Sequence, residues 1–354
     1  MMARREALGR SLAAGVDHFL VTGLVNVRYL SGFTGSNAAL LVSRDGSAVL
    51  ATDGRYATQA AAQSPDIELV LARSVAPALV ERVAAGPGSS RVAIEHHLVT
   101  LALFGQLEDA AGPRVRFVDG GHAVEQQRTV KDEEELAVLA AACAITDEVF
   151  DAVLERLRAG VTEIQIAWEL QRLMHERGAV PAFESIVAFG PNSAEPHHEP
   201  GHRELRPGDF VKLDFGARVD GYHADMTRTV CLGRAADWQR DLHAVVLDVQ
   251  SRSRDEVRVG AVPVELDTAN RTRIEEAGYD VAHGLGHGVG LQIHEAPFLV
   301  PDSTAARLVD RVAVTVEPGI YLPGRGGVRI EDTVLVHGEA AEPLTSSPRE
   351  LIEI

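Results

Sequence analysis

Two aspartates near the middle of the chain have a spacing that could bind metal ions. Asp214 and Asp225 lie on either side of Asp220-Gly221 in the segment FVKLDFGARVDGYHADMTRTVCLG, which resembles two strands and a tight turn. A two-residue turn at Asp220-Gly221 would set Asp214 opposite Thr227. The two aspartates would then be diagonal neighbours on one face, with Cα atoms roughly 7–8 Å apart. Their carboxylates could reach one or two cations, or they could be solvent-facing residues of an edge hairpin.

A histidine-rich and glycine-rich segment, AHGLGHGVGLQIHE, offers nitrogen ligands. Its three histidines are His283, His287 and His294. The four glycines make a helix improbable, so the spacing of His283 and His287 does not indicate a helical zinc motif. We expect a loop in which backbone and imidazoles approach a ligand closely.

Two glutamates in apolar strands complete the set. Glu317 ends the segment VAVTVE, and Glu331 lies within VRIEDTVLV. A buried glutamate needs a partner, and Arg329 shares a face with Glu331, so a structural ion pair is the alternative to a metal ligand. A loop, FGPNSAEPHHEPG, adds His197 and His198, which could equally be exposed surface histidines.

Together, these segments predict one site made of four carboxylates and one imidazole. Such a hard, oxygen-rich set suits two divalent ions such as Mn²⁺, Co²⁺ or Zn²⁺. Without a cation the clustered carboxylates would repel one another, and some would have to stay protonated. The expected ligands are Asp214, Asp225, His287, Glu317 and Glu331.

The elements that position these residues fall into two regions with a boundary near residues 124–129. Residues 1–125 show an α/β pattern and no arrangement of residues that indicates chemistry. We expect strands at 18–24, 38–42, 47–52, 92–95 and 115–118, and helices at 56–63 and 75–85.

The second region, 129–354, begins with a long helical pattern. We expect one helix over 129–158, with Thr129 and Asp132 as its capping box, and a second from Thr162 and Gln165 to Gly178. Two further helices are expected over about 236–258 and 263–277. The remaining segments alternate strands with glycine-rich turns.

Composition narrows the possible functions. The 354 residues carry a net charge of −17, which disfavours binding to nucleic acid. Two cysteines, Cys143 and Cys231, are too far apart to indicate a thiolate metal site. We see neither a signal peptide nor a run of apolar residues long enough for a membrane span, so we expect a cytoplasmic protein without membrane contact.

The order of these motifs resembles the pita-bread metallopeptidases, a family that includes prolidase, aminopeptidase P, methionine aminopeptidase and the metal-free creatinase. The resemblance covers residues 130–354, and residues 1–125 resemble the creatinase-like N-terminal domain of prolidase and aminopeptidase P. It implies an α/β (α+β) protein with an N-terminal domain over 1–125 and a catalytic domain over 129–354. Methionine aminopeptidase lacks the first domain, and creatinase lacks the metal ligands.

The resemblance also implies roles. Asp225 and Glu331 would bridge the two metal ions, Asp214 would complete one, and His287 with Glu317 would complete the other. Glu317 would also relay a proton during catalysis. His197 would contact the substrate, with His198 ranked second, and His294 would stabilise the tetrahedral intermediate. Substrate binding is implied for His283, Tyr321 and Arg329. Arg329 could instead orient Glu331.

The implied activity is hydrolysis of the Xaa-Pro bond in small peptides with proline at the second position. We expect a dipeptidase that binds two divalent ions, with Mn²⁺ as the first choice and Co²⁺ or Zn²⁺ as alternatives. We also expect a homodimer. Phe298 stands where many prolidases carry an arginine for the substrate carboxylate, so Arg44 or Arg55 would have to replace it. The alternatives are an Xaa-Pro aminopeptidase that takes longer peptides and, more remotely, a non-catalytic binding protein on the same fold.

Overall fold

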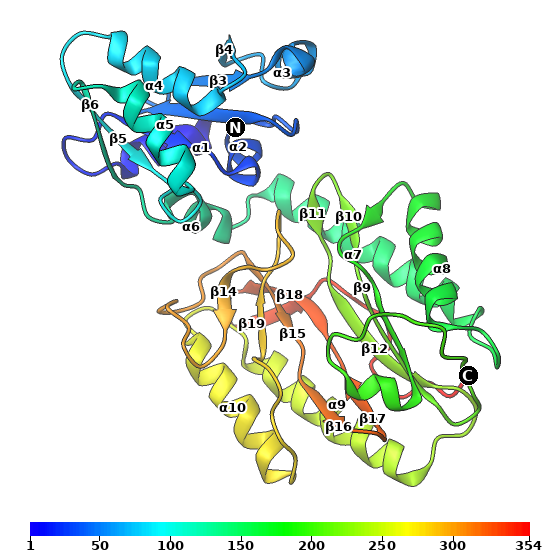
Figure 1. The fold of residues 1–354 in the computed structure, drawn as a ribbon. Helices are drawn as coiled ribbons and strands as arrows, with labels where there is room; N and C mark the ends of the chain where they lie inside the picture. Colours follow the sequence, from blue (N-terminus) through cyan, green and yellow to red (C-terminus); the bar gives the residue numbers. More distant parts are fainter. The chain divides into compact units, whose positions relative to one another are not determined.

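The structure is a computed structural model that describes residues 1–354, and the chain divides into two compact units (Figure 1). Unit 1 comprises Met1–Arg128, and unit 2 comprises Thr129–Ile354. Each unit buries its own apolar clusters. No helix in either unit has both the length and the apolar character needed to cross a membrane.

Unit 1 is built on one six-stranded mixed sheet in the order β4-β3-β2-β1-β5-β6. The antiparallel hairpin β2–β3 and its neighbour β1 form the centre, and β4, β5 and β6 pair in parallel with the strands beside them. The strands are β1 (His18–Val21), β2 (Ala38–Ser43), β3 (Ala48–Thr52), β4 (Glu68–Leu71), β5 (Ser90–Ile94) and β6 (Val115–Asp119).

Six α-helices accompany this sheet: α1 (Met2–Ser11), α2 (Leu24–Ser31), α3 (Ala57–Gln63), α4 (Val75–Ala85), α5 (Leu101–Ala111) and α6 (Ala123–Thr129). The core between α4, α5 and the sheet contains Leu20, Leu41, Leu79, Val92 and Leu107. The sequence patterns predicted α3, α4 and most of the strands, but not α1, α2, α5, α6 or β4. The helix α1 was missed because its residues have no apolar stripe at helical spacing.

Unit 2 contains four long helices: α7 (Glu133–Leu154), α8 (Glu163–Glu176), α9 (Asp237–Glu256) and α10 (Pro263–Glu276). The single helix predicted over 129–158 is confirmed as α7, but its bounds were too wide, because α6 ends at Thr129 and α7 starts after Asp132 and ends at Leu154. Asp132 is the N-cap of α7, and its capping box is made with Glu135 rather than with Thr129. The capping box of Thr162 with Gln165 at the start of α8 is confirmed.

The strands of unit 2 form three main sheets and a hairpin, with the helices packed outside them (Figure 1). Helices α7 and α8 contact the sheets of β7–β11, whereas α9 and α10 contact the later strands. The sheets are β11-β10-β7, β12-β9-β8 and β14-β13-β15-β18-β19, and β16 pairs with β17. Their strands are β7 (Val180–Pro181), β8 (Ile186–Phe189), β9 (Phe210–Phe215), β10 (Ala217–Val219), β11 (Tyr222–His223), β12 (Met226–Cys231), β13 (Gly286–Gly288), β14 (Glu295–Leu299), β15 (Val312–Val316), β16 (Gly319–Leu322), β17 (Gly326–Arg329), β18 (Asp332–His337) and β19 (Ala340–Pro343).

The aspartate hairpin has the register expected from its turn. Asp220 and Gly221 both have positive φ, and Asp214 pairs with Thr227. One register therefore runs from the turn through β10–β11 to β9–β12. A glycine is required at position 216, because a Cβ there would lie 1.7 Å from the carbonyl oxygen of Ala224. This close approach brings the backbone beside Asp225 against the strand that carries Asp214.

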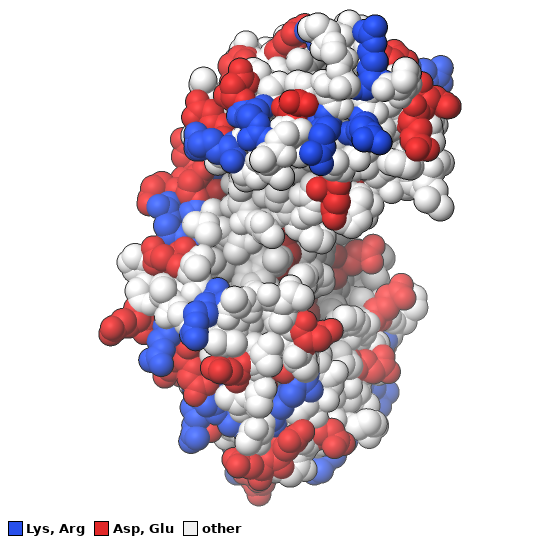
Figure 2. Space-filling model, turned by 90° about the vertical axis from the view of Figure 1, so that its left-hand side faces the viewer, with Lys and Arg blue, Asp and Glu red and all other residues white.

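The surface reflects the composition. Figure 2 shows acidic side chains spread over the face in view, with arginines between them. The net charge of −17 is thus distributed rather than gathered into one patch on this face.

Candidate active site

The five predicted metal ligands line one cavity of about 480 Å³ in unit 2. They come from separate strands and loops, so the sheets must form before the ligands can meet. Asp214 lies in β9, Asp225 precedes β12, His287 lies in β13, Glu317 follows β15, and Glu331 lies between β17 and β18.

Three of these residues form a tight group. Ligand atoms of Asp225, His287 and Glu331 all lie within 4.8 Å of one another, and all three side chains are buried. Nε2 of His287 is 3.6 Å from Oδ2 of Asp225 and 3.4 Å from Oε1 of Glu317. Carboxylate and imidazole atoms therefore face a common centre, which is the geometry that a cation could fill.

The imidazole of His287 is oriented as a metal ligand needs to be. Its Nδ1 lies 3.1 Å from the carbonyl oxygen of Gly288, so Nδ1 carries the proton and donates it. Burial lowers the pKa of His287 to about 4, and the ring is neutral at pH 7. The lone pair of Nε2 therefore points toward the carboxylates.

Burial and mutual repulsion raise the pKa values of three of the carboxyl groups. Burial, followed by the charges of Glu331, Asp214 and Glu317, raises the pKa of Asp225 well above its usual range. Burial and the charges of Glu317 and Asp214 do the same to the pKa of Glu331. Burial raises the pKa of Glu317 to about 7, although Arg329 opposes this shift. Such a set is unfavourable as anions and becomes favourable when divalent cations neutralise it.

Hydroxyl groups hold the remaining carboxylate oxygens. Oγ1 of Thr227 donates to Oε2 of Glu331 at 2.7 Å, and Oγ1 of Thr315 donates to Oε1 of Glu317 at 3.3 Å. The same Thr315 oxygen accepts the backbone N–H of His287 at 3.0 Å. Donor types, burial and orientation thus fit a hard divalent metal.

Arg329 is the cation that the protein itself supplies at this site. It forms an ion pair with Asp214, and its Nη1 donates to the hydroxyl of Tyr321 at 2.8 Å. Its Nε donates to Thr227 at 3.0 Å. Its carboxylate partner is therefore Asp214, whereas the sequence pointed to Glu331, because the side chain of Glu331 is turned toward the hydroxyl of Thr227.

The two neighbouring loop histidines, His197 and His198, have different surroundings. His197 lines the cavity, whereas Nε2 of His198 lies 2.9 Å from Oε2 of the fully buried Glu163. The loop before them is held by Lys212, whose Nζ donates to the carbonyl oxygen of Glu195 at 2.5 Å and to that of Pro196 at 3.2 Å. His198 thus anchors its loop, and His197 faces the site.

Lys212 is a residue that sequence analysis missed. It is fully buried, and burial together with the charge of Arg329 lowers its pKa to about 6. The signal was available, since Lys212 stands two residues before Asp214 in an otherwise apolar strand and therefore shares its face. The cavity wall also contains Phe298 and four apolar residues that carried no sequence signal: Phe183, Ile186, Ile293 and Val300.

His283 and His294 both line the cavity, but Tyr321 does not. The ring of His294 lies against that of His287, with centroids 4.4 Å apart. The hydroxyl of Tyr321 lies 2.9 Å from Nε2 of His283 and accepts from Arg329. The structure thus places Tyr321 behind two cavity residues, where it orients them, rather than at the cavity surface where the resemblance implied substrate contact.

Arg44 and Arg55, the two arginines of unit 1 considered as ligands for a substrate carboxylate, differ in their hydrogen-bond partners. Arg44 is committed to its own fold, because its guanidinium donates to backbone carbonyl oxygens of Leu12, Ala13 and Val16. The side chain of Arg55 is 72% exposed; its guanidinium pairs with Asp53 and lies 5.3 Å from the centroid of the Tyr56 ring. Both arginines are exposed, but only the guanidinium of Arg44 is bound to backbone carbonyl oxygens.

Comparisons with known proteins agree with this fold. Residues 137–338 match metallopeptidase family M24, and residues 4–130 match the creatinase/prolidase N-terminal domain. An uncharacterized peptidase of Bacillus subtilis is 36% identical over 96% of both chains.

Two solved structures extend the comparison over almost the whole chain. An Xaa-Pro dipeptidase from Bacillus anthracis is 35% identical and covers 100% of both chains, with a TM-score of 0.91. An X-Pro aminopeptidase from Thermotoga maritima, also 35% identical, covers 96% of this chain and 98% of its own, with a TM-score of 0.88. The chain belongs to metallopeptidase family M24 and carries a creatinase/prolidase N-terminal domain.

Proposed function

We propose that this protein is a metal-dependent Xaa-Pro dipeptidase. The observation that carries the proposal is the cavity lined by four carboxylates, three of them buried and that of Glu317 partly buried, together with one oriented, neutral imidazole. Family membership supports peptide hydrolysis, and the relatives named for Xaa-Pro bonds support proline after the scissile bond. In this proposal unit 1 is the N-terminal domain and unit 2 is the catalytic domain.

The two metal ions would be held by Asp214, Asp225, His287, Glu317 and Glu331. Bound there, divalent cations supply Lewis acidity, which polarises the scissile carbonyl and lowers the pKa of water. Mn²⁺ is the first choice and Co²⁺ or Zn²⁺ the alternatives, because this donor set accepts all three. A homodimer belongs to the same proposal and is supported by the resemblance alone, whereas a cytoplasmic location is an expectation from the sequence.

The chain's own residues would position the peptide and move the proton. His197 and His294 line the cavity, where a ring N–H can donate to the carbonyl oxygen as negative charge develops on it. The carboxylate of Glu317 would accept a proton and deliver it to the departing proline nitrogen. The apolar wall, which includes Phe183 and Phe298, would pack against the pyrrolidine ring.

An Xaa-Pro aminopeptidase is the second candidate, and one observation favours it. Arg329 is the only arginine or lysine that lines the cavity, and it is already paired with Asp214. At Phe298 the wall is apolar, so unit 2 alone provides no second cation for the free carboxylate of a dipeptide. A dipeptidase would have to bind that carboxylate with an arginine from elsewhere, and Arg55 is the candidate whose guanidinium is not bound to backbone carbonyl oxygens.

The experiment compares hydrolysis of Ala-Pro and Ala-Pro-Ala by the full-length protein with Mn²⁺, Co²⁺ or Zn²⁺ and with a chelator. Cleavage of Ala-Pro alone is the expected result. Efficient cleavage of Ala-Pro-Ala would replace the dipeptidase by the aminopeptidase. If no metal restores cleavage of either peptide, the enzymatic proposal fails.

The variant Arg55→Ala tests how a dipeptide is recognised. If Arg55 binds the substrate carboxylate, the variant raises KM for Ala-Pro and leaves the thermal stability nearly unchanged, because the side chain is 72% exposed and contacts only its neighbours Asp53 and Tyr56. Arg82→Ala is a matched control, since Arg82 is also an exposed arginine of unit 1 with one acidic partner, Glu68. Equal KM values for both variants and the wild type would exclude Arg55.

A further inference from the structure

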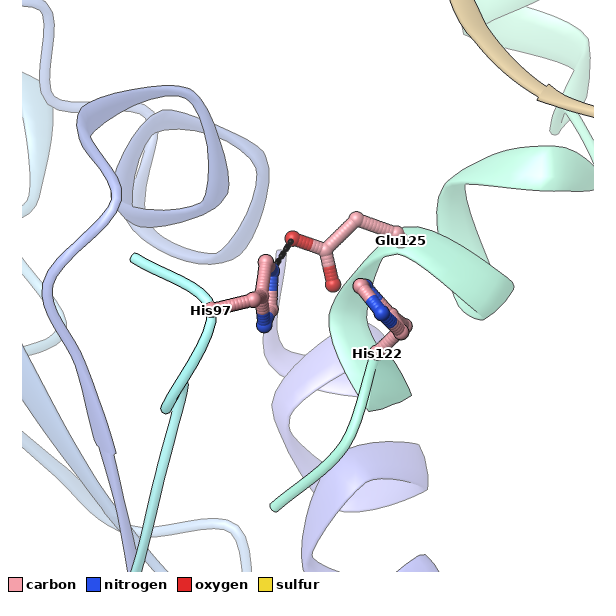
Figure 3. A group of neighbouring side chains, drawn as sticks. All are labelled: His97, His122 and Glu125. Carbon is pink, nitrogen blue, oxygen red and sulfur yellow. Dashed lines mark hydrogen bonds and ion pairs between the residues drawn. The ribbon is translucent and has the colours of Figure 1, made fainter. Parts of the chain in front are cut away.

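Unit 1, whose sequence showed no arrangement that indicates chemistry, contains a second cluster of metal-binding residue types (Figure 3). His97 lies in the connection between β5 and α5, His122 directly precedes α6, and Glu125 lies in the first turn of α6. His122 and Glu125 are three residues apart, a spacing that places two side chains on the same face of a helical turn. The fold brings His97 to them across 25 residues of chain.

The three side chains converge on one point. Nε2 of His97 lies 3.1 Å from Oε1 of Glu125, and the rings of His97 and His122 have centroids 4.0 Å apart at an interplanar angle of 43°. One ligand atom from each residue lies within 4.8 Å of the other two. Figure 3 shows both rings and the carboxylate turned toward the same space.

A hydrogen-bond network orients the carboxylate. Nδ2 of Asn26 donates to Oε1 of Glu125 at 2.7 Å and also to Oε1 of Glu95 at 2.7 Å. Asn26 is buried, and its own oxygen accepts from Nη1 of Arg128 at 2.8 Å. Partners of this kind hold a ligand in place before the metal arrives.

We propose that His97, His122 and Glu125 form a zinc-type metal site that is separate from the carboxylate cavity of unit 2. Two imidazoles and one carboxylate are a borderline donor set that suits Zn²⁺, whereas Mg²⁺ and Ca²⁺ take oxygen ligands. Three protein ligands leave at least one coordination position for water. Both histidines are exposed, so the ion can enter from solvent.

A metal ion bound at this site would stabilise unit 1. An ion bound there links the connection after β5 to α6, the last helix of unit 1. Because this arrangement exists only in the folded unit, ion binding stabilises that unit in proportion to ion concentration and affinity. The inference does not depend on the proposed peptidase activity, since none of the three residues belongs to the cavity of unit 2.

The test measures Zn²⁺ binding to the full-length protein in the background Asp225→Asn/Glu331→Gln, which removes two of the ligands proposed for unit 2. Equilibrium dialysis after chelation is followed by metal analysis, and Zn²⁺-dependent thermal shifts are recorded in parallel. We expect one Zn²⁺ per chain at this site. Its affinity should fall at least about 100-fold with His122→Ala, since even the loss of a ligand's hydrogen-bond partner costs about 10–100-fold.

His96→Ala is the matched control. His96 adjoins His97 and is exposed, but it pairs with Asp119 instead of joining the cluster. The proposal requires that His96→Ala retain the ion and its thermal shift, while His97→Ala and His122→Ala lose both. Equal Zn²⁺ binding in the background protein and in His122→Ala overturns the site, as does an equal loss in His96→Ala, which would indicate nonspecific binding by surface histidines.

Discussion

The two candidate metal clusters of this protein are opposites in burial and in donor type. In unit 2, four carboxylates and one imidazole are enclosed by apolar strands. In unit 1, two imidazoles and one carboxylate lie near the surface. Burial without a cation leaves the first cluster with strongly raised carboxyl pKa values, whereas water can solvate the second. The first cluster therefore depends on its ions to remain favourable, and the second does not.

The supports of the two clusters differ in a related way. In unit 2 the surrounding threonines, Arg329 and Lys212 fix both the ligands and the loop that carries His197. In unit 1 the side chains of Asn26 and His97 bind the one carboxylate of the cluster. A dense network indicates a site in which small displacements matter, as catalysis requires.

The largest effect is expected for the buried ligands of unit 2. Asp225→Asn or Glu331→Gln should lower kcat by at least about 1000-fold and reduce the bound metal, because no other group can replace a ligand shared by the cluster. Steady-state kinetics and metal analysis measure both effects. Asp237→Asn is the control, since that carboxylate is 96% exposed on α9. Full activity in either buried variant would contradict a catalytic role for this cluster.

A smaller effect should come from Lys212→Met, which keeps the volume of the side chain but removes its bonds to the loop before His197. We expect kcat to fall about 10–100-fold with the bound metal unchanged. The readout that separates positioning from general damage is a double-mutant cycle. Lys212→Met should cost little more in a His197→Ala background, because both changes act through the same ring. Additive losses would show that Lys212 acts elsewhere.

Chelation should reverse the stability order of the wild type and Asp225→Asn. With metal bound the wild type is the more stable protein, and with a chelator the variant becomes more stable by about 1–3 kcal/mol, because one buried like charge is gone. For a unit of this size each kcal/mol shifts Tm by about 2–4 °C. Differential scanning calorimetry measures the order. In the exposed cluster, Glu125→Gln should produce no such reversal, and a reversal there would remove the contrast between the two clusters.

The smallest effect is expected for the pH dependence of stability caused by His243, a buried histidine on α9 that belongs to neither cluster. No protein group lies within hydrogen-bond distance of its Nε2, and burial lowers its pKa to about 4. Since the ordinary value is 6.5, the unfolded chain takes up this proton first, and stability is lost as pH falls from 6.5 toward 4. A tenfold change in a protonation equilibrium corresponds to about 1.4 kcal/mol. Urea unfolding at pH 7.5 and 5 should show a smaller loss for His243→Leu than for the wild type.

Local patterns predicted a large part of the structure. The pair Asp220-Gly221 needs positive φ at both positions, and this turn alone set the register that places Asp214 opposite Thr227. The capping box of α8 was likewise readable from Thr162 and Gln165. The start of α7 was misplaced, because Thr129 and Asp132 both suit an N-cap and only the packed chain shows which of them ends the preceding helix.

Convergence of distant residues was much harder to predict. His97 and the pair His122 and Glu125 were overlooked, because no local pattern links the two segments before β5 and β6 pair side by side. The different surroundings of His197 and His198 depend on the buried Glu163, which lies in α8, 34 residues before His197 in the chain. The partner of Arg329 depends on a hydroxyl group of β12.

The sequence by itself determined the types of ligand and several local features, such as the Asp220-Gly221 turn and the cap of α8, because these depend on residues only a few positions apart. It also determined the motif order by which the family could be recognised. The tertiary structure decided which side chains face one another, how deeply the carboxylates are buried and therefore how far their pKa values rise. Those quantities depend on long-range packing, which excludes water and fixes distances that no local pattern contains.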